Sequence, residues 1–279
     1  MRLRAGIEWE LRMSFAEKYG PWAIIAGASE GTGREFARQV AAQGVNCILI
    51  ARRQGPLDEV ATQIRAESGV ECITASIDLA GPDAFDRIVE ASGDREIGLF
   101  ISNAGADPNG SRFLDKPVQS WVDLINRNVM TSVRCCHHFG GQMRERGRGG
   151  IILVGSAACY GSGPHLATYC GVKAFDLCFA EGLWSELKPH GVDVLYHVMI
   201  TTDTPALREL LESKGLPVPQ DVASPVDVAA EGLARLPFGP VNNWGQQDED
   251  VGYATNSAAA RRARVEMVAQ QSAVVFGEG

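Results

Sequence analysis

The sequence has no apolar run of about 18 residues, the length that a membrane-spanning helix needs. Its first residues, MRLRAGIEWELRMSF, also lack the continuous apolar segment and the cleavage site of a secretory signal. The seven cysteines are an odd number and include no Cys-x-x-Cys pair, which suits a reducing compartment better than a disulfide framework. We therefore expect a cytoplasmic protein without a membrane partner.

Blocks of lysine and arginine are also missing, and the formal net charge at pH 7 is -8. Because nucleic-acid binding depends on clustered positive charge, we expect no nucleic-acid partner. The one basic cluster, ARRARVE at 260–266, is interpreted as a solvated helix face. The run CCHH at 135–138 suggests zinc, but four consecutive helical residues point in four directions. We therefore expect helix packing there, and no metal.

Strand-like runs rich in valine, isoleucine and leucine alternate with segments of helical length. Strands that are buried on both faces read as continuous apolar runs, so the pattern predicts an α/β fold. We expect a doubly wound parallel sheet (Rossmann fold) with helices on both faces, as a single domain over 21–279 after an N-terminal extension at 1–20. The expected strands are WAIIAGA, NCILIA, ECITASI, IGLFISN, GIILVGS and VDVLYHVMI, and the expected helices are 31–44, 56–68, 83–92, 117–143 and 167–188.

The chain after residue 204 begins with TPALRELLESKGLPVPQ, which predicts a short amphipathic helix ending in a proline-rich turn. SPVDVAAEGLARL then predicts a helix with Ser224 at its N-cap and Pro225 in its first position. No element is predicted for FGPVNNWGQQDED, which follows.

The stretch GASEGTG at 27–33 follows the first strand and opens a helix. Its glycines let the backbone turn tightly and approach a pyrophosphate, whose charge the helix N-terminus stabilises. A bare glycine turn is the simpler alternative, but the position after the first strand favours phosphate binding. The spacing is Gly-x3-Gly-x-Gly, whereas the commonest dinucleotide fingerprint is G-x-G-x-x-G.

ATYCGVK places Tyr169 four residues before Lys173. On a helix the two side chains share one face, and a cation beside a phenol favours the phenolate. This arrangement makes a phenol usable as a general acid or base. Such a pair arises by chance in about one chain in ten of this composition, so alone it does not identify a site.

Together with the glycine loop, the pair resembles the short-chain dehydrogenase/reductase family, in its compact single-domain branch, over roughly residues 20–235. The matching motifs come in the family's order: GASEGTG, Asp78 in ASIDLA, SNAG at 102–105, Asn128 in NRNVM, and Ser156 thirteen residues before Tyr169. One stretch departs from the family, because MITTDT has Met199 and Ile200 where proline and glycine are usual.

The resemblance implies that Tyr169 is the general acid in carbonyl reduction and the base in alcohol oxidation. It implies that Lys173 stabilises the phenolate and holds the nicotinamide ribose, that Ser156 bonds the carbonyl oxygen, and that Asn128 supports a water chain. The expected cofactor-binding residues are Gly27, Ser29, Gly31, Thr32, Gly33, Arg52, Arg53, Asp78, Leu79, Asn103, Ala104, Gly105, Tyr169, Lys173, Ile200, Thr202 and Thr204.

The stretch LIARRQG favours NADP(H) over NAD(H). An NAD-binding domain of this kind ends its second strand with an acidic residue about 20 positions beyond the glycine loop. Here that residue is Ala51, and Arg52 and Arg53 follow it. A guanidinium can bind a 2′-phosphate. The alternative is two solvated arginines that open a loop, and against it stands that nothing acidic nearby replaces the missing carboxylate.

We therefore predict an NAD(P)-dependent enzyme of ketoreductase or alcohol dehydrogenase type, which uses NADP(H) on a small, apolar carbonyl or secondary alcohol. The alternative is a cofactor-binding sensor or scaffold without turnover, which would not need Tyr169. An epimerase or dehydratase would need a larger C-terminal domain. We also expect a substrate lid near 204–220. A homodimer or homotetramer is expected from the resemblance and from AFDLCFAEGLW, whose apolar residues exceed one helix stripe.

Overall fold

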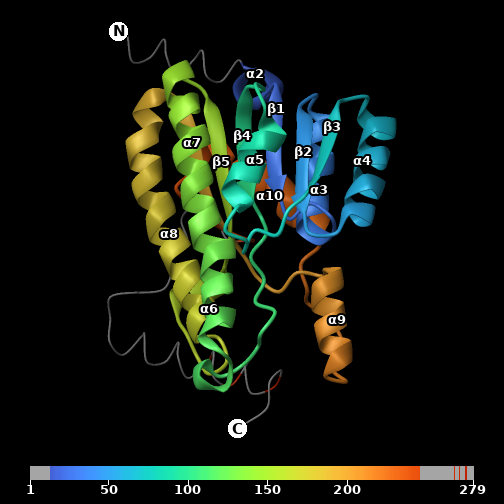
Figure 1. The fold of residues 1–279 in the computed structure, drawn as a ribbon, viewed down its shortest axis with the longest axis vertical. Coiled ribbons are helices and arrows are strands. Elements are labelled where there is room, and N and C mark those ends of the chain that lie inside the picture. The colour runs from blue at the N-terminus through green and yellow to red at the C-terminus, as the bar shows by residue number, and fades with distance from the viewer. Residues whose placement is uncertain (1–12, 246–266, 268–269, 271–273, 275–279) are drawn as a thin grey trace.

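The computed structural model describes residues 13–245 together with residues 267, 270 and 274. A parallel sheet with strand order β3-β2-β1-β4-β5-β6-β7 forms its centre (Figure 1). Every neighbouring pair of strands is parallel. The strands are β1 (Trp22–Ala26), β2 (Asn46–Ala51), β3 (Cys72–Ser76), β4 (Ile97–Ser102), β5 (Gly149–Ser156), β6 (Val192–Met199) and β7 (Val241–Asn243).

Helices cover both faces of the sheet, which confirms the doubly wound single-domain prediction. The helices in the described part of the chain are α2 (Phe15–Tyr19), α3 (Gly31–Ala42), α4 (Gln54–Ser68), α5 (Ala84–Ser92), α6 (Val118–Ile125), α7 (Thr131–Arg146), α8 (Ala167–Leu187), α9 (Pro205–Ser213) and α10 (Pro225–Arg235). Short turns of other helical types are η1 (Phe113–Asp115), η2 (Asn126–Met130), η3 (Ala157–Tyr160), η4 (Lys188–His190) and η5 (Leu236–Phe238).

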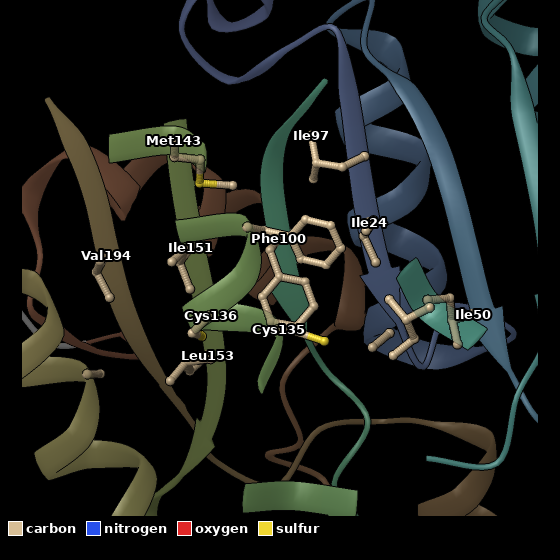
Figure 2. Close-up of a cluster of buried hydrophobic side chains, with 14 of the residues drawn as sticks. Ile24, Ile50, Ile97, Phe100, Cys135, Cys136, Met143, Ile151, Leu153 and Val194 are labelled. Atoms are coloured by element: carbon tan, nitrogen blue, oxygen red, sulfur yellow. The ribbon is translucent and has the colours of Figure 1, made fainter. Parts of the chain in front are cut away.

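Two hydrophobic clusters fill the spaces between the sheet and its helices. Ile24 of β1 packs in the cluster with α5, α7 and α8, and its neighbour Ile25 packs on the other face with α3, α4 and α10. Successive strand residues point to opposite faces, so a strand covered on both sides must be apolar throughout. Figure 2 shows Cys135 and Cys136 of α7 packed among these side chains. This is the packing role expected for the start of CCHH.

The N-terminal part of the domain is held by a short helix. Ser14 caps α2 in a capping box with Glu17. At the end of α2, Tyr19 is buried, and its hydroxyl donates to Asp193 Oδ2 of β6 over 2.6 Å. Residues 14–19, which the sequence assigned to the extension, thus pack on the sheet.

The structure differs from the sequence-based expectation in two further elements. Strand β7 lies in FGPVNN, for which nothing was predicted, and three residues are too few to show a strand pattern. The long helix expected at 117–143 is divided, because η2 is a π-helical turn between α6 and α7. The helix predicted after Ser224 is confirmed as α10, with the Ser224 hydroxyl accepting from Val226 N.

Among the residues that the structure describes, no helix is both long enough and apolar enough to cross a lipid bilayer. The basic cluster at 260–266 lies outside the described residues.

Candidate active site

The strand order reverses between β1 and β4. From β1 the chain adds β2 and β3 on one side, and it then adds β4, β5 and β6 on the other. In such sheets the loops at the carboxyl ends of the two strands separate and leave a crevice. Here the two loops are tied together. Ala104 N donates to Ala26 O over 2.9 Å, and Asn103 Nδ2 donates to Gly27 O over 3.1 Å.

The glycine loop after β1 packs closely enough to exclude side chains. A Cβ on Gly27, which has a φ of 83°, would lie 2.8 Å from Ala104 N, and one on Gly33 would overlap Gly27 O. No side chain caps α3 at its N-cap, Glu30. The buried Thr32 Oγ1 has no hydrogen-bond partner within the described residues. A helix N-terminus with open donors beside a free hydroxyl fits the pyrophosphate of a dinucleotide.

The two arginines after β2 differ in their surroundings. Arg53 Nη2 lies 2.5 Å from Glu30 Oε2 in the glycine loop, so an acidic residue that is distant in the sequence pairs with this arginine. Arg52 is exposed, and its side chain forms no ion pair with the part of the chain that is described. Its carbonyl oxygen accepts from Ser76 Oγ over 2.8 Å. Arg52 is therefore the arginine that is open to a phosphate.

Lys173 is held beneath Tyr169 by α8. The helix begins at Ala167, which puts Tyr169 in its first turn and Lys173 one turn later. The Lys173 ammonium is 6.0 Å from the centre of the Tyr169 ring. It is only 5% exposed and donates to Val154 O of β5 over 3.1 Å. The ammonium is thus fixed in place before any ligand binds.

Asn128 meets the same lysine from η2. Its Nδ2 donates to Leu124 O over 2.9 Å, while its buried Oδ1 has no hydrogen-bond partner within residues 13–245. A Cβ on Gly105 would overlap this oxygen and lie 2.7 Å from Lys173 Nζ. Gly105 therefore leaves room where the amide oxygen and the ammonium converge. Such an open buried acceptor is suited to a hydrogen-bond donor such as water.

Ser156 ends β5 with its hydroxyl oriented by the backbone, because Ala158 N donates to Ser156 Oγ over 3.2 Å. That contact occupies an acceptor position and leaves the hydroxyl hydrogen free to donate elsewhere.

The remaining predicted residues lie around the same edge of the sheet. Asp78 Oδ1 accepts from Ala80 N over 3.1 Å, and Leu79 is buried with its carbonyl bonded to Thr131. Ile200 is 47% exposed after β6, and the Thr202 hydroxyl donates to its carbonyl oxygen. Thr204 caps α9, and its Cγ2 would lie 3.0 Å from a Cβ on Gly31. Helix α9 thus starts against the glycine loop.

The family model for short chain dehydrogenases matches residues 21–215. The chain belongs to this family. The resemblance drawn from the glycine loop and the Tyr169–Lys173 pair is therefore confirmed. So is the expectation of an oxidoreductase, since relatives of the chain are dehydrogenases and reductases.

This short-chain dehydrogenase is similar to several characterised proteins. It is 33% identical to a 7β-hydroxysteroid dehydrogenase from Clostridium sardiniense over 80% of this chain and 85% of that protein. A solved 7β-hydroxysteroid dehydrogenase structure superposes with a TM-score of 0.79 at 27% identity, covering 95% of this chain and 100% of the other. A short-chain dehydrogenase from Sphingobium yanoikuyae in complex with NADPH gives 0.72 at 26% identity, covering 91% and 95%.

Sequence reasoning missed Arg127, which precedes Asn128 in this short-chain dehydrogenase. Burial lowers the pKa of the Arg127 guanidinium, and the positive charge of Arg52 lowers it further. The Asp78 carboxylate acts in the opposite direction. The charge of Arg127 therefore interacts with that of Arg52 and with the carboxylates of Asp78, Asp123 and Asp107. No sequence pattern connects residues so far apart.

Tyr196 of β6 was also missed. Its fully buried hydroxyl donates to Lys173 O over 2.9 Å and accepts from Ser156 N over 3.4 Å. It joins the end of β5 to α8. The only available sequence signal is that a buried tyrosine needs a partner for its hydroxyl.

Proposed function

We propose that this short-chain dehydrogenase uses NADP(H) to interconvert a carbonyl and a secondary alcohol on a small, apolar substrate. The observation that carries the proposal is the buried Lys173, fixed by Val154 O, with Tyr169 one turn before it on α8 and Asn128 beside it. A sensor or scaffold that only binds the cofactor would not need a phenol beside a fixed cation.

The nicotinamide, when bound, supplies or accepts the hydride. The chain's own residues handle the proton and the charge. In reduction, Tyr169 donates its hydroxyl proton to the carbonyl oxygen, and in oxidation its phenolate takes the alcohol proton. Lys173 favours the phenolate through its positive charge. Ser156 donates its free hydroxyl hydrogen to the carbonyl oxygen, where negative charge develops.

Asn128 keeps a route for the proton open. Its buried Oδ1 has no partner within the described part of the chain and lies over Gly105, beside Lys173 Nζ. We infer that it accepts from a water that returns a proton towards Tyr169 after each reduction.

The preference for NADP(H) is supported by Arg52 and Arg127. The two guanidinium groups are close enough for their charges to interact, and a 2′-phosphate bound near both would be attracted by both. Arg53 contributes less in this account, because Glu30 already neutralises its charge. At α3, the open N-terminus and Thr32 are suited to the pyrophosphate.

Two further proposals concern the surroundings of the site. The segment 204–220 acts as a lid over the substrate, because α9 starts against the glycine loop and Figure 1 shows it apart from the helices on the sheet faces. The substrate itself has an apolar body, since the exposed Ile200 replaces the usual glycine at the carboxyl end of β6.

A spectrophotometric screen tests the function. Purified protein is mixed with NADPH and with ketones that range from small cyclic ketones to steroid ketones, and the loss of NADPH absorbance is followed. We expect ketone-dependent oxidation of NADPH with at least one apolar ketone, and product alcohol in equal amount. Protein without ketone is the control. Tight NADPH binding without turnover on any ketone or alcohol would instead favour the sensor.

The expected homo-oligomer has a candidate interface on neighbouring helices. Exposed apolar side chains gather on α6, η2 and α8: Val122, Ile125, Met130 and Phe175. Phe175 is 44% exposed and stacks on Phe179. We propose that a second copy covers this face, since an apolar stripe of this kind favours association in water.

Replacing Phe175 with arginine should dissociate this oligomer, because a buried charge at an interface costs more than the apolar contact contributes. Sedimentation velocity at micromolar concentration should show a dimer or tetramer for the wild type and a smaller species for the variant. Val226→Arg on α10, which covers the other face of the sheet, is the matched control and should not change the mass. A monomeric wild type would refute the proposal.

A further inference from the structure

Asp176 continues the line that Tyr169 and Lys173 begin on α8. The three residues are spaced at i, i+4 and i+7, which places them on one helix face. Asp176 is only 4% exposed, and its Oδ2 lies 3.7 Å from Lys173 Nζ. The ammonium therefore has a phenol on one side and a carboxyl group on the other. The reaction as described above gives this carboxyl group no role.

Among the described residues, the other titratable groups that interact with Asp176 carry no positive charge. Cys136 faces it from α7, and Tyr196 faces it from β6. Burial raises the pKa of Cys136 well above its ordinary value, and it raises the pKa of Tyr196 in the same direction, so both are neutral at working pH. Among the described residues, Lys173 is thus the cation that compensates Asp176.

Asp176 is a costly residue for this position. Its Oδ1 is buried and has no hydrogen-bond partner in the described chain. Burying a carboxylate that is only partly satisfied is unfavourable, and an apolar side chain of similar size would pack at least as well. Burial raises the pKa of Asp176 to about 6, and the Lys173 charge opposes this rise. The group is therefore charged above about pH 6, in the range where the enzyme would work.

We propose that Asp176 is a positioning residue for the reaction, whose carboxylate holds the Lys173 ammonium from behind and limits how strongly the lysine charge acts on Tyr169. The proposal rests on the proposed role of Tyr169 as proton donor and acceptor. In this arrangement the phenolate of Tyr169, the ammonium of Lys173 and the carboxylate of Asp176 follow one another on a single helix face with charges of alternating sign. Asp176 touches neither substrate nor cofactor in this account.

The sign of the effect follows from the charges. With Asp176 ionised, its negative charge offsets part of the positive charge of Lys173, so the lysine favours a phenolate at Tyr169 less than it would alone. With Asp176→Asn, the full positive charge of Lys173 remains beside the phenol, so the phenolate forms at lower pH. We expect the pH midpoint of phenolate formation to fall by about one unit.

Tyrosinate absorbance in the ultraviolet measures this midpoint without substrate or cofactor, so the result does not depend on turnover. The chain has five tyrosines. Each protein is therefore titrated beside its Tyr169→Phe counterpart, and the difference isolates Tyr169. Wild type, Asp176→Asn and Asp176→Glu are compared, within the pH range where circular dichroism shows the native fold. Asp176→Ser replaces the asparagine variant if that one does not fold.

Asp176→Asn should lower the midpoint by about one unit, and Asp176→Glu, which keeps the charge, should restore it to near the wild-type value. Glu181→Gln is the matched control, because it removes a charge from an exposed position on the same helix. It should not move the midpoint. If turnover is found, alcohol oxidation by Asp176→Asn should also begin at lower pH. A midpoint that is unchanged or raised in Asp176→Asn would overturn the proposal and leave Asp176 as a packing residue.

Discussion

Tyr169→Phe should lower kcat for carbonyl reduction by a factor of about 100 to 10,000, which is the usual contribution of a general acid. The variant removes only the hydroxyl that gives its proton to the substrate. Lys173 keeps its bond to Val154 O, and the glycine loop is untouched, so NADPH binding should change less than about threefold. Steady-state kinetics and NADPH fluorescence titration measure the two effects separately.

Tyr160→Phe is the matched control. Tyr160 lies four residues after Ser156, and its hydroxyl donates to Asn243 Oδ1 over 2.8 Å. Unlike Tyr169, it is not followed by a lysine four residues later. Its loss should change kcat only a few-fold. If Tyr169→Phe kept turnover within about tenfold of wild type, or if both variants lost the same activity, the role assigned to Tyr169 would be wrong.

Replacing Ala51 with aspartate and Arg52 with isoleucine should reverse the cofactor preference. The new carboxylate repels a 2′-phosphate and can accept a hydrogen bond from the ribose 2′-hydroxyl of NAD. The lost guanidinium removes charged hydrogen bonds worth roughly 1.5 to 3 kcal/mol each. We expect the ratio of kcat/KM for NADPH to that for NADH to fall by at least about 100-fold, which corresponds to about 2.7 kcal/mol.

Arg53→Ile separates this effect from a general loss of positive charge. It removes an arginine that already pairs with Glu30, so the preference should change much less than with the Arg52 change. Equal losses for Arg52→Ile and Arg53→Ile would show that both arginines hold the phosphate. A wild type that already prefers NADH would contradict the argument at its first step.

The fold was predictable because its strands are covered on both faces. The neighbours Ile24 and Ile25 pack in clusters on opposite faces of the sheet, so both must be apolar. A continuous apolar run therefore indicates a strand of such a sheet. Strand β7 was not predicted, because its three residues after Pro240 are too few to show an alternating hydrophobic pattern. The π-helical turn at Asn126–Met130 was not predicted, because its residues continue the α-helical hydrophobic pattern of the helices before and after it.

Parts of the site were predictable where residues close in sequence are also close in space, as Tyr169 and Lys173 are on α8. Three other interactions of the site join segments that are distant in the sequence. They are the ion pair of Arg53 with Glu30, the hydrogen bond from Tyr196 to Lys173 O, and the electrostatic interaction of Arg127 with Arg52. Asp176 is three residues from Lys173, yet its burial depends on α7 and β6. Single-sequence patterns do not contain that information.

The fate of deuterium from NADPH labelled at the transferable position of the nicotinamide shows whether this protein transfers a hydride to a carbonyl. Wild-type protein is incubated with the labelled cofactor and the best ketone from the screen, and the alcohol is analysed by mass spectrometry and NMR. We expect one deuterium on the carbinol carbon, and formation of the labelled alcohol slowed at least about 100-fold in Tyr169→Phe. Alcohol without deuterium at that carbon, or cofactor that binds but is never oxidised, would contradict the claim that this protein transfers a hydride to a carbonyl.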